Sequence, residues 1–305
     1  MHNPLRPACK SIWAAFRDAL PPKAHVIVDQ LRFQRRLPNL KHPTTFSEKI
    51  ARRMLYDRDP RIPEMVDKIS AKQIMAARFG EDFVIPTIAV YDSAAEVDFA
   101  LLKYPCVIKP NHASGFNVFL PERPAGESKV RRKLSRLLRY RHQRSAEEWA
   151  YCQIMPRLLV EPFLVEPFLA EPFLAEPLPA ESLPADGNPG LTDYKFHTFD
   201  GRVFAVQVDI GRYTHHRRAF FSPSWKPMPF SLLYPTPSTH IPPPITLPKM
   251  IRYAEQIGEG FSYLRVDLYQ IAGTVKFGEA TFYPGAGLEV FKPREFDAIF
   301  GAQWS

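Results

Sequence analysis

Residues 265–287 read RVDLYQIAGTVKFGEATFYPGAG, with two runs that alternate between apolar and polar residues on either side of Ala272–Gly273. Period-two alternation around a short turn predicts an antiparallel β-hairpin. One face of this hairpin carries only apolar side chains and can be buried. These are Leu264, Val266, Leu268, Ala280 and Phe282. The other face carries charged side chains, and these indicate what the hairpin could bind.

The charged face of the hairpin suggests a metal site. Centring the turn near Gly273 pairs Asp267 with Glu279 and Arg265 with Thr281. Opposed side chains in a sheet have Cβ atoms about 5 Å apart, so two facing carboxylates repel each other. A magnesium ion held by both carboxylates and by substrate phosphates would remove the repulsion. Neutralisation by Arg265, or a register shifted by one residue, are the alternatives.

A second stretch, VIKPNHASG at residues 107–115, predicts an anion-binding loop. Its apolar run ends at Lys109, and small or polar residues follow, including Ser114 and Gly115. Backbone N–H groups in such a loop can converge on a phosphate, and a nearby lysine supplies a point charge. The loop lacks the GKS/T ending of a Walker motif. A lysine that lies along the surface at a strand end is the alternative.

The composition indicates a globular enzyme or binding protein. The chain has 305 residues, of which 45% are hydrophobic and 24% charged, and its formal net charge is +8. No apolar run reaches the roughly 18–20 residues of a membrane span. The N-terminal residues lack a continuous apolar core and a small-residue cleavage site, so we expect no secretory signal there. The three cysteines are too scattered for a disulfide framework or a CxxC metal site. We therefore expect a cytoplasmic protein.

The positive charge is concentrated in residues 128–146, SKVRRKLSRLLRYRHQRSA, which contain no acidic residue. Apolar residues recur there at helical spacing, so the segment predicts a basic amphipathic helix. Such a helix could make peripheral contact with an anionic membrane surface. It could equally be a solvated helix whose leucines face the core. Without a nucleic-acid-binding motif, no nucleic-acid partner is expected.

The remaining pattern favours helices and strands in alternation. A helix is expected to begin at Thr45 or Ser47, and another to span residues 65–80, ending at a glycine. Strands at 83–91 and 105–110 then flank a predicted helix at 94–102. This order is typical of α/β or α+β folds.

Residues 161–181 read EPFLVEPFLAEPFLAEPLPAE, a five-residue repeat. Proline at every fifth position prevents a helix and removes donors from a central strand. We interpret the repeat as an extended surface loop.

Deleting residues 166–180 should therefore change the free energy of unfolding by less than about 1 kcal/mol, measured by denaturant titration. If the deleted protein stays folded but loses its ligand affinity, one of the later glutamates of the repeat takes part in binding.

The order of these motifs resembles the ATP-grasp superfamily, and specifically its TupA-like family, named for teichuronopeptide biosynthesis. The likeness covers nearly the whole chain after the first 40 residues. It is carried by PTTFSEKI at 43–50, DK at 67–68, VIKPNHASG at 107–115, LLVEPFL at 158–164, DYKFHTFDG at 193–201, RVDLY at 265–269 and FGEATFYPGAG at 277–287. The resemblance implies ATP and Mg²⁺ as cofactors.

The resemblance also implies a role for each matching residue. Lys68, Lys109, Ser114 and Gly115 would contact the nucleotide phosphates. Glu161 would meet the adenosine, with Glu166, Glu171 and Glu176 of the repeat as rivals. Lys195 and Arg265 would act at the reacting phosphoryl group. Asp267, Glu279 and Thr281 would bind the metal.

Besides the rival glutamates of the repeat, the chain departs from the family pattern at two positions. Ala113 stands where the family loop usually has glycine, which would stiffen the loop. Thr281 stands where many ATP-grasp enzymes use asparagine, so the third metal ligand would be weaker.

The resemblance implies an α+β fold in which two subdomains clasp ATP. We expect an N-terminal helical and basic region at 1–62 and an ATP-grasp domain at 63–303. That domain would comprise a small subdomain at about 84–160, the repeat loop at 161–190 and a large subdomain at about 191–303. The sequence does not indicate an oligomeric state.

The implied activity is ATP-dependent ligation of a carboxylate to an amine through an acyl phosphate, in cell-surface polysaccharide biosynthesis. Arg212, Arg217 and Arg218 could hold the acceptor carboxylate. The alternative is a non-catalytic protein with an eroded ATP site that binds acidic polysaccharide or membrane, or a glycosyltransferase-associated accessory protein.

Overall fold

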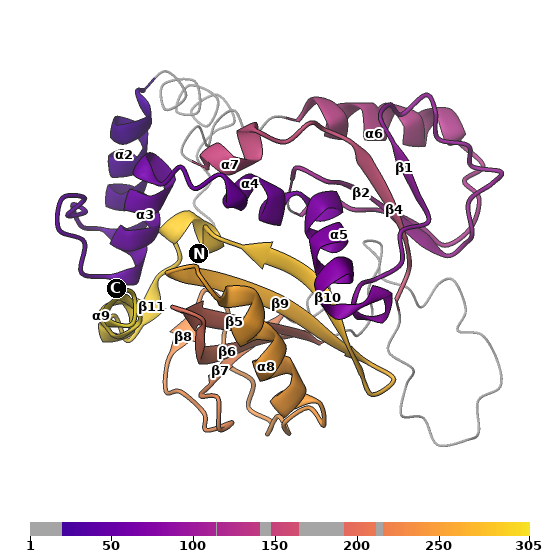
Figure 1. Cartoon of the computed structure of the whole chain (residues 1–305). Helices are drawn as coiled ribbons and strands as arrows, with labels where there is room; N and C mark the ends of the chain where they lie inside the picture. Colours follow the sequence, from indigo (N-terminus) through magenta and orange to yellow (C-terminus); the bar gives the residue numbers. More distant parts are fainter. Residues whose placement is uncertain (1–19, 114, 141–147, 165–191, 212–215) are drawn as a thin grey trace.

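The computed structural model describes residues 20–113, 115–140, 148–164, 192–211 and 216–305 (Figure 1). Ser114, the repeat beyond residue 164, Arg212 and the N-terminal 19 residues lie outside this description. No helix within the described ranges is both long and apolar enough to cross a membrane.

Two antiparallel sheets organise the fold. The first has the order β1-β4-β2-β3 and the second the order β10-β9-β5-β6-β7, while β11 and β8 form a short ribbon. The strands of the first sheet are β1 (Ala89–Tyr91), β2 (Cys106–Pro110), β3 (Val118–Leu120) and β4 (Leu158–Pro162). Those of the second are β5 (Asp193–Phe199), β6 (Arg202–Ile210), β7 (Arg217–Phe221), β9 (Tyr263–Ile271) and β10 (Thr274–Thr281). The ribbon joins β8 (Ser231–Leu232) to β11 (Phe291–Lys292).

Helices surround both sheets (Figure 1). They are α2 (Pro22–Gln34), α3 (Phe46–Tyr56), α4 (Arg61–Val66), α5 (Lys68–Phe79), α6 (Glu127–Arg139), α7 (Trp149–Cys152), α8 (Leu247–Gly258) and α9 (Glu295–Ala302). The predicted start of α3 is confirmed. Thr45 caps it and accepts a hydrogen bond from the Glu48 N–H, while the Glu48 side chain accepts one from the Thr45 N–H.

The side chains form two separate hydrophobic cores. The first joins α2, α3, α4 and α5 to the five-stranded sheet, with α8 and α9. The second lies between α6 and one face of the four-stranded sheet, and it includes Ile108, Leu134 and Leu158. The molecule therefore consists of two packed bodies, and α5 belongs to the body of the five-stranded sheet although it also faces the other sheet.

The predicted helix at 65–80 is interrupted at Asp67. This residue adopts an extended conformation (φ −68°, ψ 114°) and is the N-cap of α5. Its carboxylate accepts hydrogen bonds from the Ile69 N–H at 2.9 Å and from Asn111 Nδ2 at 3.0 Å. The break places Lys68 in the first turn of α5, where its side chain can reach the neighbouring loop.

The predicted helix at 94–102 is wrong, because this segment forms turns. The Glu96 carboxylate accepts hydrogen bonds from the N–H groups of Asp92 and Ser93, and Asp98 accepts one from the Ala100 N–H. Local bonds of this kind compete with helix formation. The predicted strand at 83–91 is likewise shortened to β1, after the 3₁₀ turn η1 (Glu81–Phe83).

Candidate functional site

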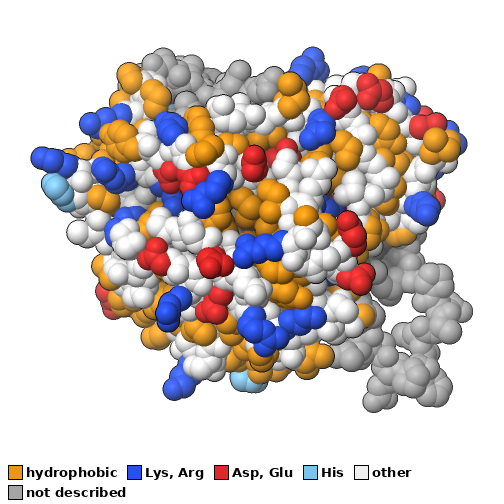
Figure 2. All heavy atoms as spheres, in the orientation of Figure 1, with side chains coloured by type: hydrophobic (Ala, Val, Ile, Leu, Met, Phe, Trp, Pro, Cys, Tyr) orange, Lys and Arg blue, Asp and Glu red, His pale blue; other side chains and the backbone are white. Residues whose placement is uncertain are grey.

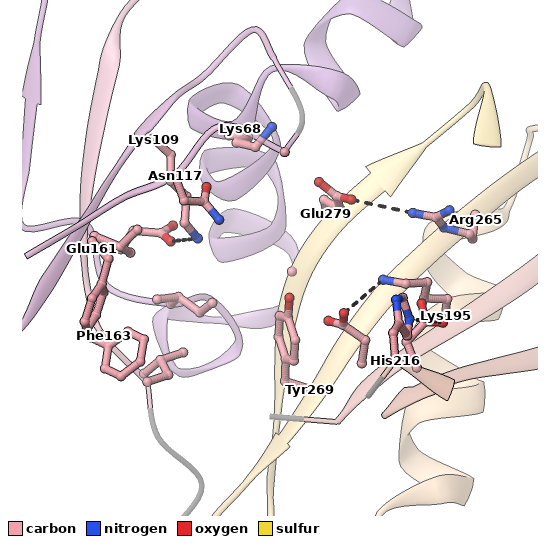
Figure 3. Close-up of a pocket in the computed structure, with 18 of the residues that line it drawn as sticks. Lys68, Lys109, Asn117, Glu161, Phe163, Lys195, His216, Arg265, Tyr269 and Glu279 are labelled. Carbon is pink, nitrogen blue, oxygen red and sulfur yellow. Dashed lines mark hydrogen bonds and ion pairs between the residues drawn. The ribbon is translucent and has the colours of Figure 1, made fainter. Parts of the chain in front are cut away.

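A cavity of about 600 Å³ lies between the two sheets. Figure 3 shows its two sides facing each other. Lys68, Lys109, Asn117, Glu161 and Phe163 come from one side, and Lys195, His216, Arg265, Tyr269 and Glu279 come from the other. Both stretches that the sequence singled out, residues 107–115 and the hairpin, therefore contribute to one site.

Alternation along β2 and β4 divides their side chains between the cavity and the second core. Val107 and Lys109 line the cavity, whereas Cys106 and Ile108 belong to the core beneath α6. Glu161 is the partner of Val107 in the ladder and points the same way. The four-stranded sheet thus has one face for the site and one for packing.

Glu161 is buried and forms ion pairs with two lysines. Its Oε1 lies 2.7 Å from Lys72 Nζ, and its Oε2 lies 2.6 Å from Lys109 Nζ. Burial raises the pKa of the Glu161 carboxyl, but the two lysines outweigh it and lower the pKa from 4.5 to about 2. Burial lowers the pKa of Lys72. The carboxylate is therefore ionised at neutral pH, and each of its two oxygens forms an ion pair with a lysine.

This low pKa predicts an acid-dependent loss of stability. Because the folded-state pKa is below the unfolded value, the stabilisation is present above pH 4.5 and is lost as the pH falls to about 2. The shift corresponds to about 3 kcal/mol. The free energy of unfolding should differ between the wild type and Glu161→Gln most above pH 4.5. If this difference, measured by denaturant titration, stays constant between pH 5 and about 2, the ion pairs do not form.

Apolar side chains adjoin Glu161. Val107, Phe119 and Phe163 line the cavity on this side, together with Ile85. The rings of Phe119 and Phe163 have centroids 4.1 Å apart. An apolar pocket beside an engaged carboxylate is suited to a flat heterocycle that also carries hydrogen-bonding groups.

The loop after β2 contacts the start of α5. Lys68 Nζ donates a hydrogen bond to the Ala113 carbonyl at 2.8 Å, and the Lys68 N–H donates to the Asn111 carbonyl at 3.2 Å. Gly115 lines the cavity with a φ of +80°, a conformation that favours glycine. Asn111 is fully buried and bonded to Asp67, so its amide supports the loop from behind.

On the opposite side, one row of polar residues crosses the five-stranded sheet. Lys195 pairs with Gln207 on β6 and with Asp267 on β9, and Asp267 pairs with Glu279 on β10. The predicted opposition of Asp267 and Glu279 is confirmed, as is that of Arg265 and Thr281. A bulge between Phe277 and Glu279 precedes these pairs.

Asp267 is held by two basic side chains. Its carboxylate lies 2.7 Å from Arg265 Nε and 2.7 Å from Lys195 Nζ. Burial raises the pKa of Asp267, but these cations outweigh it and the pKa is lowered. Burial opposes the charge on Arg265, yet its pKa is raised by Asp267. Arg265 also donates to Thr281 Oγ1 at 3.1 Å.

The two hairpin carboxylates differ in access. The Glu279 side chain is 33% exposed and lines the cavity, whereas that of Asp267 is 2% exposed. Arg265 lies between them, since its NH2 is 3.5 Å from Glu279 Oε1 and 2.8 Å from Asp267 Oδ2. The described residues contain no group of three or more His, Cys, Asp or Glu side chains that could hold a metal. Two carboxylates and a hydroxyl match the oxygen ligands of Mg²⁺, but only Glu279 is accessible without displacing a cation.

Arg218, which also lines the cavity, is already bound by two carboxylates of the chain. Its Nε donates to Asp209 Oδ1 at 2.6 Å, and its NH1 lies 3.3 Å from Glu289 Oε2. Asp209 also contacts His216 at 3.1 Å, and His216 stacks on Tyr234 with ring centroids 3.6 Å apart. Two carboxylates of the chain already bind Arg218, so a substrate carboxylate could reach it only by displacing one of them.

Arg217 is exposed and is not among the residues that line the cavity. Among the described residues, the Glu289 carboxylate forms an ion pair with Arg218 alone, and its side chain is 26% exposed in the cavity. It can accept a hydrogen bond from a bound ligand.

The charge balance differs between the two sides. The side from the four-stranded sheet and α5 has three lysines against Glu161, so it favours an anion. The other side has more acidic than basic side chains in the cavity. The acidic ones are Asp193, Asp209, Glu279 and Glu289, and the basic ones are Lys195, Arg218 and Arg265. A polyanion that spans both sides would require a cation near the second.

Sequence reasoning missed several residues of the site. Lys72 lies four residues after Lys68 on α5, so helical spacing places both on one face. Phe163 lies two residues after Glu161 in an extended segment, which gives it the same orientation. These two were detectable from spacing alone. No local signal indicated Asp209 or Glu289, because their proximity depends on the tertiary fold.

A family model described as TupA-like ATPgrasp matches residues 48–167 and 174–305. None of the curated proteins matches the sequence.

Among solved structures, the D-alanine–D-alanine ligase from Bacillus anthracis is 16% identical, with a TM-score of 0.40 over 78% of this chain and 64% of that one. The ATP-grasp ligase PsnB, complexed with a minimal precursor, is 11% identical, with a TM-score of 0.39 over 73% and 54%. A phosphoribosylamine–glycine ligase from Thermotoga maritima is 12% identical, with a TM-score of 0.40 over 72% and 48%. The chain thus spans about half to two-thirds of the length of these three structures.

Proposed function

The chain belongs to the TupA-like ATP-grasp family, and from this membership we propose that it is a Mg-ATP-dependent ligase that joins a carboxylate to an amine. The observation that supports this most directly is the cavity, in which lysines on one side face Arg265, Lys195 and Glu279 on the other (Figure 3). A triphosphate is the polyanion that such an arrangement accommodates.

The nucleotide would lie along the four-stranded sheet. The adenine fits the apolar pocket of Val107, Phe119 and Phe163, with Glu161 beside it. The phosphates would then follow Lys109 and Lys68 toward the second sheet. Their last group would meet Arg265 and Lys195.

Magnesium would be held by Glu279 and, once Asp267 exchanges one of its cationic partners, by Asp267 as well. When bound, the ion neutralises charge on the triphosphate and polarises it. Thr281 already accepts a hydrogen bond from Arg265, so its hydroxyl is a weaker candidate ligand.

The chemistry requires no nucleophile from the protein. A substrate carboxylate oxygen attacks the γ-phosphorus, the bond to the bridging oxygen breaks, and ADP leaves. A neutral amine then attacks the acyl carbon, a C–N bond forms, and inorganic phosphate leaves as the amine gives up a proton. Arg265 would stabilise the charge that develops on the transferred phosphoryl group, because it is already positioned by Asp267.

The substrates would approach from the end of the cavity near Arg218. Because Arg218 is bound to Asp209 and Glu289, we expect the acceptor carboxylate to contact Arg265 instead. Glu289 would contact the amine. We further propose that the acceptor is a uronic acid of a cell-surface polysaccharide precursor, that the amine belongs to an amino acid, and that the reaction occurs in the cytoplasm, where ATP is available.

Replacing Lys72 with methionine tests the nucleotide orientation. Glu161 would keep Lys109 as its only cation, so Lys109 would be held more tightly and the adenine end would be misaligned. We expect KM for ATP to rise about tenfold with little change in kcat, and the free energy of unfolding to fall by about 1–3 kcal/mol. Steady-state kinetics at saturating acceptor measure this. A fall in kcat with an unchanged KM would place Lys72 outside the adenosine end.

The function itself is tested by ADP release. The protein is incubated with ATP, magnesium and a panel of uronic acids and amino acids, first singly and then in pairs. The proposal predicts stoichiometric ADP and amide product for at least one pair, and none without magnesium. If magnesium-ATP fails to raise the unfolding temperature, the protein is an eroded, non-catalytic member of the family.

A further inference from the structure

Every exposed charged residue of α6 is a cation. Leu134 and Leu137 on its other face are buried in the second core. The exposed cations lie at intervals of three or four residues, which places them along one side of the helix. They are Lys129, Arg132, Lys133, Arg136 and Arg139. We call them the α6 cations.

No described acidic residue forms an ion pair with any of the α6 cations. Glu127 is the one acidic residue of the helix, and it faces Arg123 and Arg131 instead, at 2.8 and 3.7 Å. Arg131 itself donates to the carbonyls of Ala94 and Ala95, so it belongs to the packed side. Glu127 and Arg131, which form an ion pair, thus lie apart from the α6 cations, which form no ion pair with a described residue.

The α6 cations form a row about 15 Å long, because ten residues separate Lys129 from Arg139. They stand on a convex helix surface, which suits a flat array of negative charges. No aromatic side chain lies within α6, so the stacking that supports single-stranded nucleic-acid binding is missing there. In the view of Figure 2, basic side chains over the rest of the molecule are interspersed with acidic and hydrophobic ones.

This face lies on the outside of the four-stranded sheet. Figure 1 shows α6 on the side of that sheet away from the five-stranded sheet. The strands beneath it point Ile108 toward α6 and Lys109 toward the cavity. A surface that binds α6 would therefore leave the cavity accessible.

We propose that the α6 cations dock the protein on the surface of a bilayer that contains anionic phospholipids. Clusters of four to eight basic residues on an amphipathic helix suit anionic headgroups, and each contributes about fivefold in affinity. The leucines are already buried in the protein, so the contact is electrostatic and reversible, and it weakens as salt rises. The inference does not depend on the proposed ligase activity.

The test uses vesicle co-sedimentation of the full chain at about 0.1 M salt. Vesicles of phosphatidylcholine alone are compared with an equimolar mixture of phosphatidylcholine and phosphatidylglycerol. The helix variant combines Lys129→Gln, Arg132→Gln, Lys133→Gln, Arg136→Gln and Arg139→Gln. The matched control variant removes five exposed cations elsewhere, through Lys23→Gln, Lys41→Gln, Arg202→Gln, Lys226→Gln and Lys292→Gln. Both variants lower the formal net charge of +8 equally.

The wild type should bind the anionic vesicles and not the neutral ones. The helix variant should lose at least about 100-fold in affinity and the control variant less than about tenfold. Both should keep the wild-type unfolding temperature, because every changed side chain is exposed. Equal losses in the two variants would overturn the proposal, as would no binding of the wild type. Tighter binding to duplex DNA or heparin, lost in the helix variant, would assign the surface to another polyanion.

Discussion

Replacing Glu279 with glutamine is expected to lower magnesium-dependent ATP turnover by about two orders of magnitude while the protein stays folded. The substitution keeps the shape of the side chain and removes the one hairpin carboxylate that is open to the cavity. The free energy of unfolding should change by less than about 1 kcal/mol. Its ion pair with Arg265 is long, at 3.5 Å, and Arg265 keeps its shorter bonds to Asp267.

Glu289→Gln is a matched control for this experiment. Glu289 is also a partly exposed carboxylate of the cavity with a single arginine ion-pair partner, Arg218 at 3.3 Å. Magnesium titrations of ADP release should show a higher midpoint for Glu279→Gln and an unchanged one for Glu289→Gln. The control should instead raise KM for the amine. A Glu279→Gln protein with wild-type turnover and magnesium requirement would contradict the metal assignment.

Arg265→Met should lower both turnover and stability, and each by more than Glu279→Gln does. It leaves the buried Asp267 with Lys195 alone and removes the cation expected at the transferred phosphoryl group. We expect turnover to fall by more than about 1000-fold and the free energy of unfolding to fall by about 3–5 kcal/mol. Arg265→Lys should recover part of the stability. A lysine cannot make the two parallel bonds that Nε and NH2 make to Asp267.

A double variant separates the two roles of Arg265. Combining Arg265→Met with Asp267→Asn removes the buried carboxylate that has lost its arginine partner, so part of the stability should return. Turnover should not return, because neither substitution restores a cation near the phosphoryl group. Thermal unfolding and ADP release are measured on the wild type, on Arg265→Met and on the double variant. Recovered turnover in the double variant would show that Arg265 serves only to hold Asp267.

The hairpin shows how far the sequence could be followed. Alternation predicted its strands, its buried face and the opposition of Asp267 and Glu279 correctly. The turn itself is tighter than expected, since Thr274 pairs with Ile271. The bulge at Gly278 then shifts the register by one residue and brings Glu279 opposite Asp267. A side chain at 278 would meet the Tyr269 ring at 2.7 Å, so glycine is needed there.

Other parts of the site could not be predicted, for two physical reasons. Local hydrogen bonds decided the turns at 94–102 and the break at Asp67, and their strength does not appear in apolar periodicity. The engagement of Arg218 by Asp209 and Glu289 joins residues from separate strands and loops. Sequence reasoning identified Arg218 as a candidate cation of the site, but it could not show that Asp209 and Glu289 already neutralise it.

The contacts along the seam where the two packed bodies meet bear on the cost of separating these bodies. Lys72 of one body binds Glu161 of the other, Asp67 binds Asn111, and Lys68 binds the Ala113 carbonyl. All three contacts are polar, so water can hydrogen-bond to each of these groups once the contact is broken. Separation of the two bodies along this line therefore breaks the buried Lys72–Glu161 ion pair, and we expect the phosphates of a nucleotide to offset that cost by binding the lysines it releases.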